Sequence, residues 1–449
     1  MPVGSCVSGM THDGGLMAHL SRRSVILAVG LVLTLAGTAS SAISWSKQHG
    51  IPRAYSWNYG DSLDFSGTPA DPTFRLLDAF ISDATTPQAA YVSSSHDGVT
   101  WTTPRRLSSA AVNAEGATIA AAGTRIVVGW VTGFSAYDPA GAPRRLQVNT
   151  STDGGSTWRG IKSLTPRAGR IDYPIVAATK TAFGPVNLYA VWIDATNGKV
   201  YFRERSGAGA WSVPLSIGAT TLRDRVDGYH GFADIAAVGN LLTVAWVADA
   251  KGSLKARAIN LSGKTPTAAA TRANWDAPVA LGGRVSLRQG GYPVVSASPL
   301  APGVVTIAWN TPAKQVYTTF DGTNVTATPT TIWVNGTANA IAYAGGYSTV
   351  VEPAPGGFIA MWAGCEDRSL TNDCNGRNDA ARVDLLSATS ADGTLFTPPS
   401  LVAPATPSRT LNDQASVVAT SDHVYAQYNG YTANFGRYDV FDRIGTGSP

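Results

Sequence analysis

The feature that most constrains the fold is a short apolar strand that ends in an aromatic residue and recurs along the chain. Two weaker copies end at Phe80 and Tyr428, and five copies end in tryptophan: Trp130, Trp192, Trp246, Trp309 and Trp362. The seven aromatics are spaced 50 to 66 residues apart, with an average of 58. A repeat of this length is typical of solenoids and propellers. We expect each aromatic to anchor the core of one repeat.

Each repeat contains four strands in the same order. In the repeat that begins at Asp172, the expected strands are residues 174–178, 188–192, 200–205 and 211–215. Abundant glycine (47) and proline (26) and few charged residues (14%) also favour an all-β protein. Four short strands repeated around a centre describe a β-propeller blade. We therefore predict an all-β propeller of seven blades, each of four antiparallel strands, with six blades as the alternative.

The last repeat shows only three strands, at residues 415–420, 424–428 and 438–442. An open sheet edge invites unwanted pairing, so a fourth strand is expected from elsewhere in the chain. Residues 43–47, or a segment slightly later, are predicted to pair with this blade and close the ring. Residues 43–449 are accordingly expected to form a single propeller domain.

Residues 1–42 have the features of an export signal. Arg22 and Arg23 precede an apolar run over residues 25–36, which small residues follow up to Ala42. The paired arginines resemble a twin-arginine signal, and a plain secretory signal is the alternative. Met17 is a second candidate start. The run is too short to cross a bilayer, so we expect a secreted or extracytoplasmic protein with no stable membrane insertion.

Cysteine usage and charge narrow the classes of partner. Cys6 lies in the leader, which leaves Cys365 and Cys374 to form a disulfide in an oxidising compartment. A zinc site is the weaker alternative, because two thiols without a nearby histidine are too few ligands. The net charge of +4 is not gathered in runs, so no nucleic-acid partner is expected. We expect a monomer without a cofactor, with calcium on the polar loop 365–379 as an alternative.

A second motif falls after the third strand of a repeat. Ser151, Asp153, Gly155, Thr157 and Trp158 form the pattern Ser-x-Asp-x-Gly-x-Thr-Trp, which we call the Asp-box. Its hydroxyls and carboxylate can hold the backbone of a tight turn, its glycines permit positive φ, and its indole can anchor the turn. Shorter copies occur at residues 95–101, 320–323 and 390–396. These boxes are interpreted as structural, not catalytic.

With these boxes, the chain resembles the Asp-box (BNR repeat) sialidase-like β-propellers. The resemblance covers the whole of residues 43–449 and implies the propeller fold. It implies a glycan-active protein less directly, because one fold carries many functions.

The candidate site lies at the mouth of the channel, where loops enter the innermost strands. We align six of these strands on Ala117, Pro174, Ala233, Pro293, Ser348 and Ala415. The preceding position then holds Gly116, Tyr173, Phe232, Tyr292, Tyr347 and Gln414, and acids stand one residue earlier at Glu115, Asp172 and Asp413. Tyr229, His230, Asn412, Arg170 and Arg288 lie just before these positions. Aromatic faces and polar groups together suit a sugar site; packing between blades is the alternative.

Several glycan chemistries remain open at this mouth. Glu115, Asp172 and Asp413 are candidate carboxylates for glycoside hydrolysis. The resemblance implies a tyrosine nucleophile with an activating glutamate, for which Tyr347 and Glu352 are candidates, although residues five apart on a strand face opposite sides. It also implies three arginines that hold a substrate carboxylate, and candidates just before the inner strands are Arg167, Arg170, Arg223, Arg225, Arg284, Arg288 and Arg409.

The sequence leaves one leading function and two alternatives. The leading expectation is an exported, sialidase-like glycoside hydrolase whose substrate contacts are Arg170, Tyr173, Tyr229, His230, Arg288, Tyr292 and Asn412. The first alternative is a non-catalytic carbohydrate- or protein-binding propeller, because the sialidase Arg-Ile-Pro signature is absent and Ile51-Pro-Arg53 reverses it. The second is a polysaccharide lyase that uses His230 with Tyr229.

Overall fold

The computed structural model describes residues 43–47, 49–56, 62–66, 74–82, 87–133, 144–171, 175–180, 184–222, 232–265, 267–285, 292–311, 314–326, 328–334, 349–365, 383–404, 409–432 and 438–446. The chain divides into two units, Met1–Ala39 and Ser40–Pro449, and all described residues belong to the second. The predicted export signal, residues 1–42, lies outside them. No helix among them is long and apolar enough to cross a membrane.

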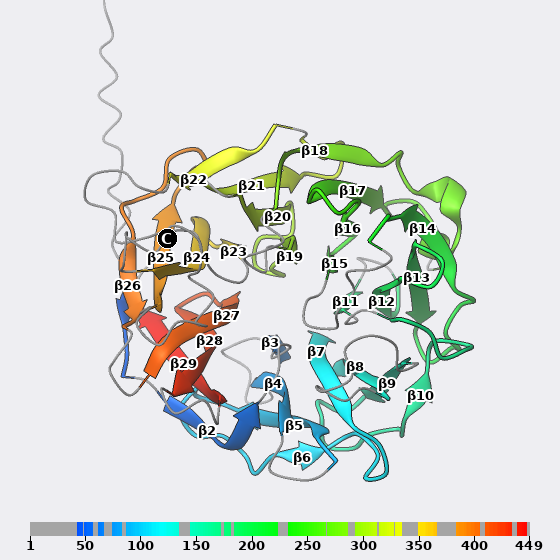
Figure 1. Ribbon diagram of the computed structural model, residues 1–449, viewed down its shortest axis with the longest axis horizontal. Helices are drawn as coiled ribbons and strands as arrows, with labels where there is room; N and C mark the ends of the chain where they lie inside the picture. The colour runs from blue at the N-terminus through cyan, green and yellow to red at the C-terminus, as the bar shows by residue number, and fades with distance from the viewer. Residues whose placement is uncertain are drawn as a thin grey trace, which may run out of the picture. The chain divides into compact units, whose positions relative to one another are not determined.

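The described residues form seven blades arranged around a centre (Figure 1). This confirms the predicted all-β propeller and excludes the six-bladed alternative. In each of blades 1 to 5, four antiparallel strands follow the chain order outward from the centre. Blade 1 contains β3 (Ser62–Ser66), β4 (Arg75–Ser82), β5 (Ala89–Ser95) and β6 (Arg105–Arg106). Blade 2 contains β7 (Ala114–Ala122), β8 (Arg125–Thr132), β9 (Arg145–Ser151) and β10 (Lys162–Ser163).

The middle blades repeat this order. Blade 3 contains β11 (Ile175–Lys180), β12 (Val186–Asp194), β13 (Lys199–Ser206) and β14 (Leu215–Ala219). Blade 4 contains β15 (Ala233–Val238), β16 (Leu241–Val247), β17 (Ser253–Asn260) and β18 (Val279–Arg284), with two short 3₁₀ turns, η1 (Ala268–Ala270) and η2 (Arg272–Asn274), before its last strand. Blade 5 contains β19 (Val294–Ser296), β20 (Val305–Asn310), β21 (Lys314–Phe320) and β22 (Thr330–Val334).

Blades 6 and 7 share one hydrogen-bonded sheet through a single parallel bridge, Val383 to Leu411. Blade 6 contains β23 (Thr349–Ala354), β24 (Gly357–Cys365), β25 (Val383–Ser390) and β26 (Ser400–Ala403). Blade 7 contains β27 (Arg409–Ala419), β28 (His423–Thr432) and β29 (Tyr438–Thr446). The polar loop after Cys365 joins the second and third strands of blade 6, as predicted, but Cys374 and the side chain of Cys365 lie outside the described residues, as does a calcium site on that loop.

The first strands of the domain complete blade 7. β1 (Ser44–Trp45) pairs antiparallel with β29, with Ser44 opposite Thr446. β2 (His49–Ser56) also pairs with β29, and Figure 1 shows this blue strand beside the red end of the chain. The predicted closure by residues 43–47 is therefore confirmed, and the outermost strand of blade 7 comes from the start of the domain.

The predicted aromatic anchors lie on the second strand of each blade. They are at most 2% exposed, from Phe80 on β4 to Tyr428 on β28. The ring of Trp246 in blade 4 packs against Gly218 of blade 3, where a larger residue would leave no room for it. A Cβ added to Gly218 on β14 would lie 2.6 Å from a ring carbon of Trp246. The anchors thus pack between blades as well as within them.

Carboxylates on three innermost strands join one blade to the next. Asp64 on β3 accepts the N–H of Ala121 on β7 at 2.7 Å, and Asp234 on β15 accepts that of Val295 on β19 at 2.7 Å. Glu352 on β23 likewise accepts a backbone hydrogen bond from Ala419 on β27. Burial raises the pKa of Asp64 and of Asp234 to about 7, and it raises the pKa of Glu352 well above its usual value. We call these three groups the inner carboxylates.

The Asp-box holds its turn as predicted. Ser151 Oγ donates to Asp153 Oδ1 at 2.7 Å and accepts the N–H of Gly155 at 2.9 Å. Thr157 donates to the same carboxylate through its N–H at 2.8 Å and its hydroxyl at 2.5 Å. Gly154 and Gly155 have φ of 68° and 90°. These hydrogen bonds, Thr157 first, lower the pKa of Asp153 to about 2. Its shorter copies also follow third strands.

Candidate functional site

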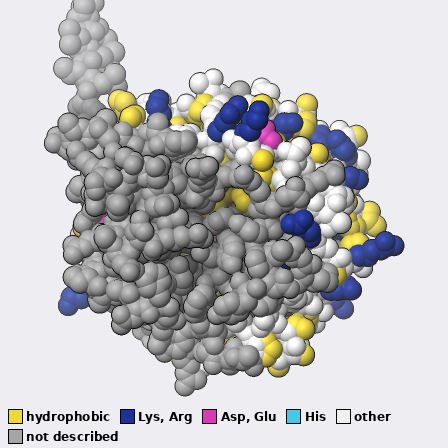
Figure 2. Space-filling model, viewed as in Figure 1, with side chains coloured by type: hydrophobic (Ala, Val, Ile, Leu, Met, Phe, Trp, Pro, Cys, Tyr) yellow, Lys and Arg dark blue, Asp and Glu magenta, His cyan; other side chains and the backbone are white. Residues whose placement is uncertain are grey.

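Two kinds of connection share one face of the propeller, which we call the mouth face. They are the segments that lead into innermost strands and the turns between second and third strands. Because strand direction alternates along each blade, the turns between third and fourth strands, where the Asp-boxes lie, are at the opposite end. Figure 2 shows the face seen in Figure 1, where Lys and Arg side chains gather along the edge.

Many of the predicted site residues lie outside the described part of the chain. They are Asp172, Tyr173, Tyr229, His230, Arg288 and Tyr347. Asn412 and Asp413 lie on β27, where their backbones pair with Gly430 and Asn429, but their side chains are not described. The roles expected for these residues stay predictions. Glu115, Arg170 and Tyr292 are described.

Glu115 is placed in the core of the ring rather than on the mouth surface. It lies on β7 opposite Val131, and its side chain has no exposed area. A bulge follows at Gly116, which has φ of 60°. Phe232, one of the aligned mouth aromatics, is 4% exposed and belongs to the hydrophobic core. Packing between blades therefore accounts for this member of the alignment, whereas Tyr292 is partly exposed.

The pairing of β23 with β24 corrects one step of the mouth alignment. In blade 4 the aligned inner-strand residue, Ala233, lies opposite Trp246, and in blade 5 Pro293 directly precedes Val294, which pairs with Ala308 beside Trp309. In blade 6, however, Thr349 lies opposite Trp362, so the equivalent residue is Thr349 and not Ser348. A shift of one residue along a strand exchanges the two faces. The alignment of blade 6 therefore starts one residue too early, but Tyr347 itself lies outside the described residues and its expected role stays a prediction.

A cavity of about 350 Å³ opens on the mouth face between blades 2 and 3, and we call it the blade 2–3 pocket. One wall is the segment that leads into β11, and the other is the turn from β12 to β13. Pro214 adds a contact before β14. The lining residues are Thr165, Pro166, Arg167, Ala168, Gly169, Ile171, Trp192, Asp194, Thr196, Asn197, Tyr201 and Pro214.

Backbone hydrogen bonds fix the two walls relative to each other. Ala195 N–H donates to the carbonyl of Arg170 at 2.8 Å, and Arg170 N–H donates to Thr196 Oγ1 at 3.0 Å. Gly169 bridges back to Arg144 of blade 2 through two backbone hydrogen bonds. A Cβ added to Gly169 would lie 3.3 Å from Thr196 Oγ1 and 3.4 Å from Asp194 Oδ1. Glycine at this position thus lets the walls approach closely.

Asp194 organises the turn that forms the outer wall. Its Oδ1 accepts the N–H of Thr196 at 3.0 Å, and its Oδ2 accepts Asn197 Nδ2 at 3.0 Å. Asn197 Nδ2 also donates to the hydroxyl of Tyr201 at 3.1 Å. A carboxylate has about four acceptor positions, so the partly exposed Asp194 keeps capacity for ligand hydroxyls. No Lys or Arg of the described ranges forms an ion pair with it.

An aromatic pair forms the floor of the blade 2–3 pocket. The rings of Trp192 and Tyr201 stack with centroids 5.6 Å apart and an angle of 23° between their planes. Trp192 is 2% exposed, while Tyr201 on β13 is partly exposed. Arg167 is exposed at the rim. An aromatic floor with carboxylate, amide and hydroxyl groups around it can hold the apolar face and the hydroxyls of a sugar ring.

Alignment of the inner strands did not predict Thr196, Asn197 and Tyr201 as site residues. They belong to the turn between the second and third strands, which that alignment does not include. The run Asp194-Ala-Thr-Asn-Gly198 is itself a turn signal, and Tyr201 follows it at the start of the third strand. That signal in a turn facing the mouth would have identified the outer wall.

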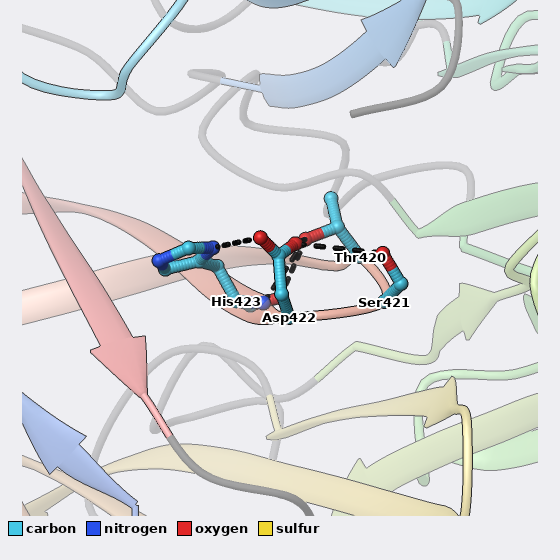
Figure 3. A network of polar contacts seen from close by, with 4 residues as sticks. All are labelled: Thr420, Ser421, Asp422 and His423. Carbon is cyan, nitrogen blue, oxygen red and sulfur yellow. Dashed lines mark hydrogen bonds and ion pairs between the residues drawn. The ribbon is translucent and has the colours of Figure 1, made fainter. Parts of the chain in front are cut away.

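The one ion pair among the described residues lies away from the mouth face. His423 Nδ1 and Asp422 Oδ2 are 2.9 Å apart in the turn from β27 to β28. Figure 3 shows Thr420 and Ser421 contacting the same carboxylate, at 3.2 and 3.5 Å. The side chains of His423 and Asp422 are 35% and 56% exposed, so their ion pair adds little to the stability of the fold. We interpret this network as a turn cap.

Nothing in the described part of the chain groups three or more His, Cys, Asp or Glu side chains as a metal site. No protein-family model and no curated protein matches the sequence.

Solved structures with a similar arrangement include three glycan-related proteins. A Trypanosoma rangeli sialidase in complex with sialic acid is 11% identical over 90% of this chain, with a TM-score of 0.43, and this chain spans 59% of its length. The phage phi92 endosialidase is 9% identical over 91% of this chain and 69% of its own, with a TM-score of 0.48. A fucose-recognising lectin of Aleuria aurantia, with six blades, is 13% identical over 79% of this chain and 99% of its own, with a TM-score of 0.44. At these values the similarities carry no inference about function.

Proposed function

We propose that this protein is a glycan-recognising propeller that holds a sugar residue in the blade 2–3 pocket. The observation that carries the proposal is the pocket itself: the stacked Trp192 and Tyr201 beneath the polar groups of Asp194 and Asn197, on the mouth face. A cavity of about 350 Å³ falls within the range usual for small-ligand sites. Arg167 at the rim adds a donor for a sugar carboxylate or hydroxyl.

The sialidase-like glycoside hydrolase expected from the sequence is the catalytic form of this proposal. Asp172 follows directly on the segment that forms the inner wall of the pocket, one residue after Ile171. A sugar bound in the pocket would thus lie beside the part of the chain that carries Asp172 and Tyr173. In this form Asp172 and Asp413 supply the acid and base, and Tyr347, Tyr229, His230, Arg288 and Asn412 complete the mouth.

Binding is tested with an array of neutral and acidic oligosaccharides, followed by titration calorimetry on those retained. Asp194→Asn keeps an acceptor for the Thr196 N–H but removes the charge, so we expect about a tenfold loss of affinity. Tyr201→Ala should lose at least as much, because it removes the exposed ring of the floor. Lys199→Ala changes an exposed residue of the same turn outside the pocket, and it should bind as the parent does.

Turnover distinguishes the catalytic form from a lectin-like one. The same saccharides are incubated with the protein, and released reducing ends and unsaturated products are measured. A hydrolase should release reducing ends and lose this activity in Asp172→Asn and Asp413→Asn. Saturable binding without any product would make the protein a binding propeller, and unsaturated products would make it a lyase. If the protein showed no binding and no turnover, the proposal would be overturned, and an assembly module would remain as the interpretation.

We further propose that residues 1–42 direct export and that residues 43–449 act as one monomeric domain. The support is the start of β1 at Ser44, directly after the predicted signal, and its pairing with β29. N-terminal sequencing of the protein recovered outside the producing cell tests this. A mature protein that begins well inside β1 or β2 would contradict it, because the closing strands would be lost.

A further inference from the structure

The lining of the blade 2–3 pocket contains more apolar surface than a plain hexose would use. The C–H face of a sugar ring needs a flat aromatic platform, and the stacked pair on the floor provides it. Further apolar side chains line the same cavity around this floor. Of these, Ile171 is 2% exposed, Ala168 and Pro214 are partly exposed, and Pro166 is exposed. They offer contacts to an apolar substituent that a plain hexose lacks.

One guanidinium holds the two segments of the lining that carry prolines. Arg203 on β13 donates through Nη1 to the carbonyl of Leu164 at 2.6 Å, just before Pro166 in the chain. Through Nη2 it donates to the carbonyl of Trp211 at 3.2 Å, just before Pro214. Both segments are thus tied to the same side chain across the boundary between blades 2 and 3. The apolar part of the lining is therefore preformed, which lowers the entropic cost of binding.

Two polar groups of the outer wall lie close together beside this apolar lining. A Cβ on Gly169 would be 3.3 Å from Thr196 Oγ1 and 3.4 Å from Asp194 Oδ1, so both oxygens lie next to one point of the inner wall. Thr196 Oγ1 accepts the Arg170 N–H, and its hydroxyl hydrogen has no acceptor among the described residues. The Asp194 carboxylate is an acceptor. A donor beside an acceptor matches an amide group, which has one N–H and one carbonyl.

The charges of the lining favour a neutral sugar. Arg167 and Asp194 are the two charged residues that line the cavity. A sugar carboxylate would share a space of about 350 Å³ with the Asp194 carboxylate, and a sugar ammonium group would share it with the Arg167 guanidinium. Like charges at such short range repel each other. An uncharged polar group avoids both costs.

We infer that the blade 2–3 pocket selects a neutral acetamido sugar, an N-acetylhexosamine. The amide N–H of the sugar donates to Asp194, its amide carbonyl accepts the hydroxyl hydrogen of Thr196, and its methyl group contacts Pro166 and Pro214. The aromatic floor holds the sugar ring. This inference rests on the proposed function, because it names the sugar for the same pocket, but it can fail while that function stands.

Matched saccharides test the inference by titration calorimetry on the full protein. Chitohexaose, cellohexaose and the glucosamine hexasaccharide share one β-linked backbone and carry an acetamido, a hydroxyl and an ammonium group, respectively, on the second carbon of each ring. The methyl glycosides of N-acetylgalactosamine and galactose form a second pair, and 3′-sialyllactose is the acidic acetamido probe. We expect an acetamido member to bind about tenfold more tightly than its hydroxyl counterpart, because the counterpart lacks the amide hydrogen bonds.

The oligosaccharide array separates failure of this inference from failure of the proposed function. If the array retains glycans, but acetamido sugars bind no more tightly than their hydroxyl counterparts, the inference is overturned and the proposed function stands. Tighter binding of the glucosamine hexasaccharide or of 3′-sialyllactose than of the neutral acetamido probes would also overturn it, because the preferred sugar would then be charged. If the array retains no glycan, both are overturned.

Variants are compared by the ratio of affinities for the acetamido probe and its hydroxyl counterpart. Thr196→Val should lower this ratio about tenfold, because it removes the donor to the amide carbonyl. Thr196→Ser restores the hydroxyl and should restore the ratio.

Pro214→Ser should lower the ratio about fourfold, which corresponds to the contacts of one buried methyl group. Val213→Ser is the matched control: Val213 is 79% exposed, precedes Pro214 and does not line the pocket, so the ratio should not change. Unchanged melting temperatures would show that the fold is intact. An unchanged ratio in both Thr196→Val and Pro214→Ser would refute the inference, even if both variants bound more weakly overall.

Discussion

Gln427 Nε2 donates a hydrogen bond of 2.6 Å to Asp78 Oδ1, which lies 349 residues earlier in the chain. Neither side chain has any exposed area. Gln427 lies on β28 and Asp78 on β4, so the hydrogen bond joins the second strand of blade 7 to that of blade 1. Close by, Ser416 Oγ accepts the N–H of Leu63 at 3.0 Å between the innermost strands of the same blades. The two ends of the ring are thus joined by buried polar contacts as well as by β1.

Removal of the Gln427 amide should destabilise the ring where it closes. Gln427→Leu takes a donor from a buried carboxylate, so we expect the free energy of unfolding to fall by about 2 to 3 kcal/mol. Chemical denaturation of Gln427→Leu, Asp78→Asn and the double variant measures the coupling. The double variant should lose less than the sum of the single ones. Strict additivity would show that the contact contributes nothing.

Ser151→Ala should loosen the Asp-box turn of blade 2 without changing the charge of the protein. Ser151 has no exposed area, and its loss leaves the Gly155 N–H without its acceptor. We expect a decrease of about 1 to 2 kcal/mol in the free energy of unfolding. Ser156→Ala, an exposed residue of the same turn, serves as the control and should change stability little. Equal effects of the two changes would contradict the turn-locking role.

The inner carboxylates should make stability depend on pH in an uncommon direction. The folded pKa of Asp64 is raised from 3.8 to about 7, so the folded state keeps a proton that the unfolded chain has lost. Protonation therefore favours folding, and the free energy of unfolding should fall as pH rises from about 4 to about 7. Asp234 contributes in the same direction.

Asp64→Asn tests this dependence through the slope of stability against pH rather than its absolute value, because the amide also loses one backbone hydrogen bond. The slope between pH 4 and 7 should become flatter. Asp97→Asn is the control: burial acts to raise the pKa of Asp97, but hydrogen bonds from Thr100 and Val99 outweigh it and bring it to about 2. That variant should leave the slope between pH 4 and 7 unchanged, because Asp97 changes its protonation only below about pH 4. An unchanged slope in Asp64→Asn would disprove the expectation.

Gly169→Ala should weaken ligand binding at the mouth face more than it weakens the fold. The new methyl group would press on Thr196 and Asp194 at 3.3 and 3.4 Å and push the outer wall of the blade 2–3 pocket away. We expect about a tenfold loss of affinity for the mouth-face saccharide with little change in melting temperature. Gly303→Ala, where a Cβ meets nothing within 4 Å, is the control. Full affinity in Gly169→Ala would place the sugar elsewhere.

The architecture could be predicted from the sequence because the anchors recur at every blade. Trp130, Trp192 and their equivalents fill the same position of the second strand, and a large apolar side chain there allows few alternatives. The fourth strand of blade 3 was predicted at residues 211–215 and lies instead at Leu215–Ala219. Ser212 contacts β13 before this strand begins: its N–H donates to the Glu204 carbonyl, and its hydroxyl accepts the Glu204 N–H.

The candidate site was predicted only as a face. The inner strands predict a site at the mouth, which stays a prediction, whereas the blade 2–3 pocket on that face combines Arg167 and Gly169 from one connection with Asn197 and Tyr201 from another. Pairing across blades depends on the ring's geometry, which no local pattern encodes. For the same reason the sequence did not predict that Glu352 would reach β27, or that Asp64 would reach β7. A carboxylate on an inner strand has the same local pattern whether it faces a ligand or a neighbouring blade.

The pairing of Ser44 with Thr446 makes the first and last strands of the domain neighbours in blade 7. Because both ends of the domain lie in one sheet, the chain could begin and end at another blade without changing which blades are neighbours in the ring. Joining residues 44 and 446 by a short linker and reopening the chain between two other blades would leave every blade with the same neighbours. Such a circular permutant would move the ends of the chain away from blade 7 and leave the blade 2–3 pocket with the same residues.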